Sequence, residues 1–147
     1  DIHGNEISFE RFKGKVVYIV NVASQCGYTE QNYRQIKSLQ KYYDSGLDIV
    51  LAPCNAFGQQ EPGSPTEVYG FATRKGFGGI ILEKNEVNGP FSRPSFLYLK
   101  HTTGKDNIEW NFDGKFLVDR NGKAYVANDD IEAHIQELLS QPYEDLQ

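Results

Sequence analysis

Hydrophobic and polar positions are grouped along the chain in blocks that predict alternating strands and helices. Residues 15–21 (KVVYIVN) are dominated by β-branched side chains and follow Gly14, which is typical of a buried central strand. Apolar residues then recur at near-helical spacing over 29–43, before Gly46, and residues 47–53 (LDIVLAP) are apolar again. The order strand, helix, strand predicts a parallel pair with a right-handed crossover.

A second helix is predicted to begin at Pro65. Ser64 and Glu67 have the spacing of a capping box, and proline is favoured at the first helical position. The polar, glycine-rich residues 55–63 before it are expected to form a loop. After this helix comes a short apolar stretch at 76–82.

The last third of the chain predicts a brief helix at 94–100, a β-hairpin and a final helix. The hairpin strands, 116–119 and 123–126, flank Asn121-Gly122, a strong turn signal. The final helix is amphipathic and follows polar cap residues. Its caps and apolar positions are Asn128, Asp129, Asp130, Ile131, Ile135, Leu138 and Leu139.

This element order predicts an α/β protein with a thioredoxin-like fold, in which a central mixed β-sheet carries helices on both faces. A chain of 147 residues, 39% of them hydrophobic, buries one core but is short for two ordinary domains. We therefore expect a single domain over residues 1–147.

Charge and hydropathy exclude several classes of partner. The formal net charge is −5, and lysine and arginine form no basic stripe, so nucleic acid is not expected as a partner. No run approaches the ~20 apolar residues that span a bilayer, and residues 1–10 lack the apolar core of a signal peptide. We expect no stable membrane insertion and a cytoplasmic location, with a secreted or organellar location as the alternative.

The two cysteines, Cys26 and Cys54, form neither a disulfide scaffold nor a short-spaced zinc pattern. His3, His101 and His134 are scattered along the chain and never paired at i, i+4. We therefore expect no bound metal or cofactor, and at least one free thiol.

Cys26 lies between a predicted strand and a predicted helix, where open α/β sheets place reactive groups. The positive end of a helix dipole favours the thiolate, which is the nucleophilic form. Thr29 stands where a thioredoxin-type dithiol would have its second cysteine, so Cys26 acts alone or with a distant partner. Attack on a peroxide bond fits a lone thiol. The alternative is a buried cysteine that packs as a small hydrophobic residue.

Four blocks resemble the signatures of the glutathione peroxidases, in the family's order. They are residues 21–29 (NVASQCGYT), 52–63 (APCNAFGQQEPG), 87–90 (VNGP) and 110–119 (WNFDGKFLVD). The resemblance implies an antioxidant oxidoreductase that reduces hydrogen peroxide and organic or lipid hydroperoxides. Its reductant would be glutathione or a thioredoxin-like thiol, as co-substrate rather than cofactor.

The same resemblance implies a catalytic group of Cys26, Gln60, Trp110 and Asn111. The amides and the indole N–H are hydrogen-bond donors that stabilise a thiolate and the charge on a leaving oxygen. Gln60 is preferred to Gln59 because it directly precedes the Glu-Pro-Gly of the family pattern.

Departures from the family pattern refine this picture. The helix segment at 71–74 lacks the resolving cysteine of thioredoxin-dependent members, and Cys54 matches a family cysteine for which we expect a structural role. Only nine residues separate Lys100 from Trp110, so the insertion that builds tetramers is absent. The chain therefore resembles the monomeric, phospholipid-hydroperoxide and plant-like branch. Some family members have selenocysteine where Cys26 stands.

Two alternatives to an enzyme remain at this point. One is a redox sensor or relay that passes oxidation from Cys26 to a partner protein. The other is a catalytically degraded thioredoxin-fold binding module. It is suggested by changes near the site, where Ala56 replaces a family glutamine and Asp113-Gly114 carries an extra residue.

Overall fold

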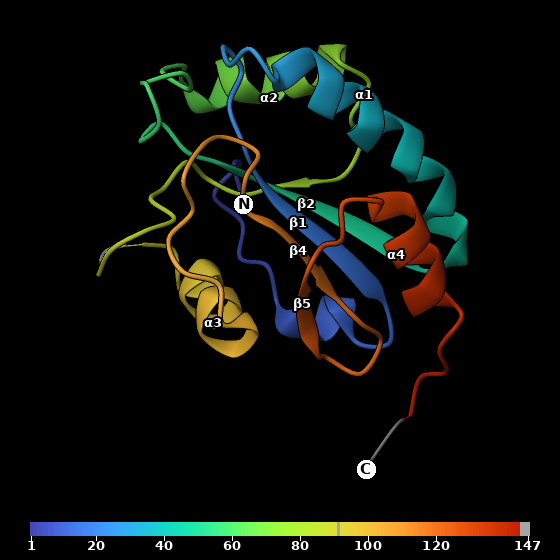
Figure 1. Cartoon of the computed structure of the whole chain (residues 1–147). Coiled ribbons are helices and arrows are strands. Elements are labelled where there is room, and N and C mark those ends of the chain that lie inside the picture. Colours follow the sequence, from blue (N-terminus) through green and yellow to red (C-terminus); the bar gives the residue numbers. More distant parts are fainter. Residues whose placement is uncertain (91, 145–147) are drawn as a thin grey trace.

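A five-stranded mixed sheet forms the centre of the protein, with the strand order β3-β2-β1-β4-β5 (Figure 1). The first three strands are parallel, and the last two run antiparallel as a hairpin. Their bounds are β1 Val16–Val22, β2 Leu47–Pro53, β3 Ile80–Ile81, β4 Lys115–Val118 and β5 Ala124–Val126. The computed structural model describes residues 1–90 and 92–144, so Phe91 and residues 145–147 of the expected domain lie outside the described residues.

Helices cover both faces of this sheet, as the sequence predicts. One face carries α1 (Thr29–Leu39), α2 (Pro65–Arg74) and α4 (Ile131–Leu139), whose apolar residues share one core cluster. The other face carries α3 (Pro94–Thr103) and the short 3-10 helix η1 (Phe9–Phe12) (Figure 1).

Side chains of β1 alternate between these two faces, because successive strand residues point to opposite sides. Val16, Tyr18 and Val20 enter the core cluster shared with α1, whereas Val17 and Ile19 pack on the face of η1. Burial on both faces explains why β1 and β2 appear in the sequence as nearly continuous apolar runs.

The first helix differs from its predicted length. It ends at Leu39, and the chain continues as the 3-10 helix η2 (Gln40–Ser45) up to Gly46, whose φ is +105°. The Gln40 side chain accepts a hydrogen bond from Gly78 N and donates one to Gly76 O, which fixes the tighter turn against the segment before β3. The α-helix has 3.6 residues per turn and the 3-10 helix has 3.0, and apolar spacing over six residues barely distinguishes them. The sequence pattern therefore predicts one continuous helix.

The other predicted caps and turns are present. Ser64 and Glu67 form both halves of the capping box at Pro65. Asp130 accepts a hydrogen bond from Ala133 N at the start of α4. The β4–β5 hairpin turns at Gly122, with a φ of +89°. Within the described residues, no helix has the length and apolar character needed to cross a membrane.

Candidate active site

Cys26 lies in the loop between β1 and α1, at the end of the sheet where the parallel strands finish. Its side chain is mostly covered, with 9% of the residue exposed. The backbone N–H of Tyr28 donates to Cys26 Sγ at 3.4 Å, so an amide at the start of α1 points at the sulfur. Amides at a helix N-terminus stabilise negative charge, as a thiolate requires.

Thr29 fixes this loop. Its Oγ1 accepts a hydrogen bond from Cys26 N at 3.0 Å and donates one to Ala23 O at 2.7 Å. The residue that occupies the place of a second cysteine therefore fixes the backbone from Ala23 to Cys26 against the start of α1.

The side chains of Gln60 and Asn111 are joined by a hydrogen bond, although 51 positions separate the two residues in the sequence. Asn111 Nδ2 donates to Gln60 Oε1 at 2.9 Å and to Phe57 O at 3.2 Å. The Gln25 N–H, next to Cys26, donates to Gln60 O at 3.0 Å. The loop after β2 thus links the cysteine loop to Asn111.

Trp110 forms the exposed edge of this group, with 38% of the residue exposed. Its ring lies 6.0 Å from that of Phe57, centroid to centroid. Gly58 has a φ of +69°, and a Cβ there would approach Trp110 Cη2 to 3.0 Å and Gln60 Nε2 to 3.4 Å. A glycine is therefore required for Gln60 and Trp110 to lie this close.

Strained backbone is found beside two of the predicted site residues. In the described part of the chain, two residues other than glycine have positive φ: Gln59 at +53° and Phe112 at +63°. Gln59 directly precedes Gln60, and Phe112 directly follows Asn111. Such conformations persist where surrounding contacts impose them, and they cluster at functional sites.

Asn21 imposes the conformation at Phe112. It is fully buried at the end of β1. Its side chain donates to Trp110 O at 3.0 Å and accepts from Gly114 N at 2.7 Å, and its carbonyl accepts from Phe112 N at 2.9 Å. One buried amide therefore holds the whole turn that carries Trp110 and Asn111.

Sequence reasoning missed Asn21 and also Glu61 as site residues. Asn21 carried a signal, because a polar side chain in a buried apolar strand must find hydrogen-bond partners. Glu61 lay inside a quoted block, but its contacts with Ser24 are formed only when two distant loops meet.

Cys54 lies on the other face of the sheet. It is fully buried in the cluster of Ala52, Val87 and Phe96, whereas Cys26 belongs to the cluster on the α1 face. Burial raises the pKa of the Cys54 thiol above its ordinary value. A thiol in this environment is held in its unreactive, protonated form.

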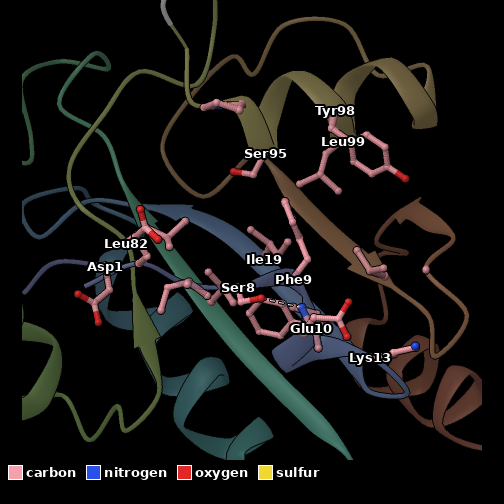
Figure 2. A pocket seen from close by; sticks show the side chains of 18 of the residues that line it. Asp1, Ser8, Phe9, Glu10, Lys13, Ile19, Leu82, Ser95, Tyr98 and Leu99 are labelled. Atoms are coloured by element: carbon pink, nitrogen blue, oxygen red, sulfur yellow. Dashed lines mark hydrogen bonds between the residues drawn. The ribbon is translucent and has the colours of Figure 1, made fainter. Parts of the chain in front are cut away.

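The large cavity of the protein is also separate from the predicted site. It has a volume of about 1560 Å³ and lies between η1, the sheet and α3. In Figure 2, Ser95 and Leu99 of α3 lie across it from Ile19 of β1. Cys26, Gln60, Trp110 and Asn111 do not line it.

Comparison with known families shows to which family the chain belongs. The family model for glutathione peroxidase matches residues 1–100. The chain belongs to the glutathione peroxidase family. The match includes Cys26 and Gln60, and the geometry above adds Trp110 and Asn111 beside Gln60.

Plant members of the family are similar over most of this chain. A phospholipid hydroperoxide glutathione peroxidase of Pisum sativum, named as chloroplastic, is 43% identical over 92% of the chain and 61% of its own length. Phospholipid hydroperoxide glutathione peroxidase 1 of Arabidopsis thaliana, also named as chloroplastic, is 43% identical over 95% of the chain and 64% of its own length. The chain thus spans less than two thirds of these relatives.

Solved structures confirm the thioredoxin-like fold. Trgpx in its apo form has a TM-score of 0.74 and 28% identity, covering 98% of this chain and 93% of that one. T. cruzi GPX1 has a TM-score of 0.69 and 31% identity, covering 93% and 90%. A thiol-disulfide isomerase of Corynebacterium glutamicum shares the fold at 16% identity and a TM-score of 0.67, covering 95% and 90%.

The cytoplasmic location expected from the sequence is wrong. The pea and Arabidopsis relatives are named as chloroplastic, and a further Arabidopsis relative as mitochondrial, which points to an organelle. Compartment is specified by targeting segments that receptors read and proteases remove, so the composition of a folded domain does not reveal it. 

Proposed function

We propose that this protein is a thiol-dependent peroxidase in which Cys26 attacks hydroperoxides. The observation that carries the proposal is the junction of two loops. Gln25, next to the thiol at the start of α1, donates its N–H to the carbonyl of Gln60, whose side chain is hydrogen-bonded to Asn111 and lies near Trp110. Family membership supports the same chemistry. A protein of this family with a lone reactive thiol needs no second cysteine for the first step.

The first step transfers one oxygen atom to sulfur. The Cys26 thiolate attacks the outer oxygen of ROOH, the O–O bond breaks, and the departing RO⁻ takes up a proton to leave as alcohol, or as water when R is hydrogen. Sulfur is oxidised to sulfenic acid, and the peroxide is reduced. In this scheme the Gln60 amide and the Trp110 indole donate hydrogen bonds to the charge that moves from sulfur to oxygen. Asn111, whose two amide hydrogens go to Gln60 Oε1 and Phe57 O, orients Gln60.

Two molecules of an external thiol complete the cycle. The first, glutathione in our proposal, condenses with the sulfenic acid to a mixed disulfide and releases water. The second attacks the glutathione sulfur, returning Cys26 as a thiol and leaving oxidised glutathione. The substrates that we propose include lipid hydroperoxides, because Tyr28, two residues from the thiol, and Trp110 of the proposed catalytic group both expose aromatic surface.

Turnover assays test this function directly. Peroxide consumption is measured in the steady state with glutathione and, separately, with a reduced thioredoxin. Sustained turnover with either thiol supports the peroxidase. One rapid oxidation without turnover would favour a redox relay, and no oxidation at low peroxide would leave only a binding module.

The proposed group of Gln60, Asn111 and Trp110 predicts slower oxidation of Cys26 when any one of them is replaced. We expect Gln60→Ala, Asn111→Ala and Trp110→Phe each to slow oxidation of Cys26 by roughly 10- to 1,000-fold. The Gln60 and Trp110 variants lose a preorganised hydrogen-bond donor, and the Asn111 variant loses the side chain that orients Gln60. Stopped-flow measurement of Cys26 oxidation provides the rate. Gln59→Ala is the matched control, since it removes a neighbouring amide. Unchanged rates in all three variants would refute the proposed group.

We also propose that the protein is a monomer. The interval between α3 and Trp110 is short, and the net charge of −5 opposes casual association. Light scattering at micromolar concentration is expected to give the monomer mass of 16.7 kDa. A fourfold mass would contradict this proposal.

A further inference from the structure

Glu61 is a buried carboxyl group that the mechanism above does not use. The residue has 0% exposure, directly follows Gln60, and lies in the loop after β2 where this loop meets the one that carries Cys26. Its Oε1 accepts two hydrogen bonds from Ser24, one from the backbone N–H at 3.1 Å and one from the hydroxyl. Its own N–H donates to Asn55 Oδ1 at 2.9 Å.

These contacts make Glu61 part of a continuous link between the two loops. Ser24 is bonded to the Glu61 side chain, and the next residue, Gln25, donates its N–H to Gln60 O at 3.0 Å. Cys26 follows Gln25. Ser24 and Gln25, the two residues before the thiol, are therefore hydrogen-bonded to Glu61 and Gln60 in the other loop. Of these, Gln60 is a predicted hydrogen-bond donor to the substrate.

Stability alone gives little reason for a carboxyl group at this position. Glu61 Oε2 is buried and has no hydrogen-bond partner among the residues that the structure describes. The nearby cation gives limited compensation, because Lys84 Nζ donates to the backbone oxygens of Glu61 and Gly63 rather than to the carboxylate. Burial raises the pKa of Glu61. Burying a carboxyl group with an unpaired oxygen is costly, so the residue requires another explanation.

We propose that Glu61 is a positioning residue for Cys26, whose carboxyl oxygen holds Ser24 and thereby keeps the thiol loop in register with Gln60. This inference rests on the proposed peroxidase function. What matters in it is the acceptor oxygen, since both donors come from Ser24. An amide in place of the carboxyl group preserves this acceptor, whereas alanine removes it.

The decisive experiment compares Glu61→Ala with Glu61→Gln in two measurements. Amide hydrogen exchange by NMR at Ser24 and Gln25 reports whether the loop is held. Stopped-flow oxidation by peroxide reports whether Cys26 is positioned. Glu109→Gln, which changes an exposed glutamate next to Trp110, is the matched control.

We expect Glu61→Ala to accelerate exchange at Ser24 and Gln25 at least ~10-fold, while Tyr18 in β1 keeps its protection. Cys26 oxidation is expected to slow by about 10- to 100-fold, because small misplacements of reacting groups have effects of this size. Glu61→Gln is expected to stay within about threefold of wild type in both measurements, because it retains the acceptor. If Glu61 only filled space, Glu61→Ala would loosen the surrounding structure in general. The positioning role instead predicts faster exchange confined to Ser24 and Gln25, and its rescue in Glu61→Gln.

Unchanged exchange and oxidation in Glu61→Ala would overturn the proposal, as would a Glu61→Gln variant as slow as alanine. If Glu61→Ala does not fold, Ser24→Ala replaces it. That variant loses only the hydroxyl donor and is expected to slow oxidation about fivefold; no change would overturn the proposal. If wild type itself is not oxidised by peroxide, the proposed function fails, while the exchange rates still decide whether Glu61 holds the loop.

Discussion

Replacing Cys26 with serine is expected to abolish peroxide reduction, whereas Cys54→Ser leaves most of it. The serine hydroxyl cannot form a sulfenic acid, so the loss is expected to be on the order of 10³-fold or more, as when a nucleophile is removed from other enzymes. Cys54 is buried among apolar side chains on the face opposite to the α1 core.

Steady-state peroxide consumption with glutathione measures both variants. Thermal unfolding is the accompanying control, because a serine hydroxyl in the Cys54 pocket lowers stability without touching the chemistry. Activity of Cys54→Ser is therefore compared at a temperature at which both proteins are folded. Equal losses in the two variants would contradict the assignment of Cys26 as the single reactive thiol.

The fold was largely predictable because its signals are local. The apolar runs of β1 and β2, the capping box at Ser64 and the Asn121-Gly122 turn each depend on neighbouring residues, and each is present in the structure. The end of α1 was not predictable in this way. It depends on Gln40 reaching Gly76 and Gly78, which lie more than 35 positions away.

In the candidate site, the residues could be predicted from the sequence but the contacts between them could not. Cys26 was predicted from its place between a strand and a helix, and Gln60, Trp110 and Asn111 from family resemblance. The contacts that join them were not predictable, because Asn21 and Glu61 act through residues 89 and 37 positions away. Burial of these two polar side chains becomes visible only when the loops are assembled.

The second large effect concerns the product of a single oxidation. One equivalent of peroxide without added thiol is expected to convert Cys26 to its sulfenic acid, because the described residues hold no other thiol on that face of the sheet. Excess peroxide is expected to drive it on to the irreversible sulfinic or sulfonic acid. With glutathione present, a mixed disulfide is expected instead.

The competing product is an internal Cys26–Cys54 disulfide. Cys54 N is bonded to Val22 O at 3.2 Å, so the backbones of the two segments are close at the end of the sheet. A disulfide nevertheless needs Cα atoms within ~7 Å and Cβ vectors that converge. Here the two thiols belong to different core clusters on opposite faces, and Cys54 would have to leave its packing against Ala52 and Phe96.

Intact mass spectrometry after one equivalent of peroxide separates the two products. Sulfenic acid adds about 16 mass units, whereas an internal disulfide removes about 2. Cys54→Ser is the matched control, since it still forms the sulfenic acid but has no partner for a disulfide. We expect the same gain in wild type and in this variant, because burial raises the pKa of the Cys54 thiol and keeps it from attacking the oxidised sulfur. A dominant loss of two units in wild type, absent from Cys54→Ser, would replace the one-cysteine cycle with a two-cysteine one.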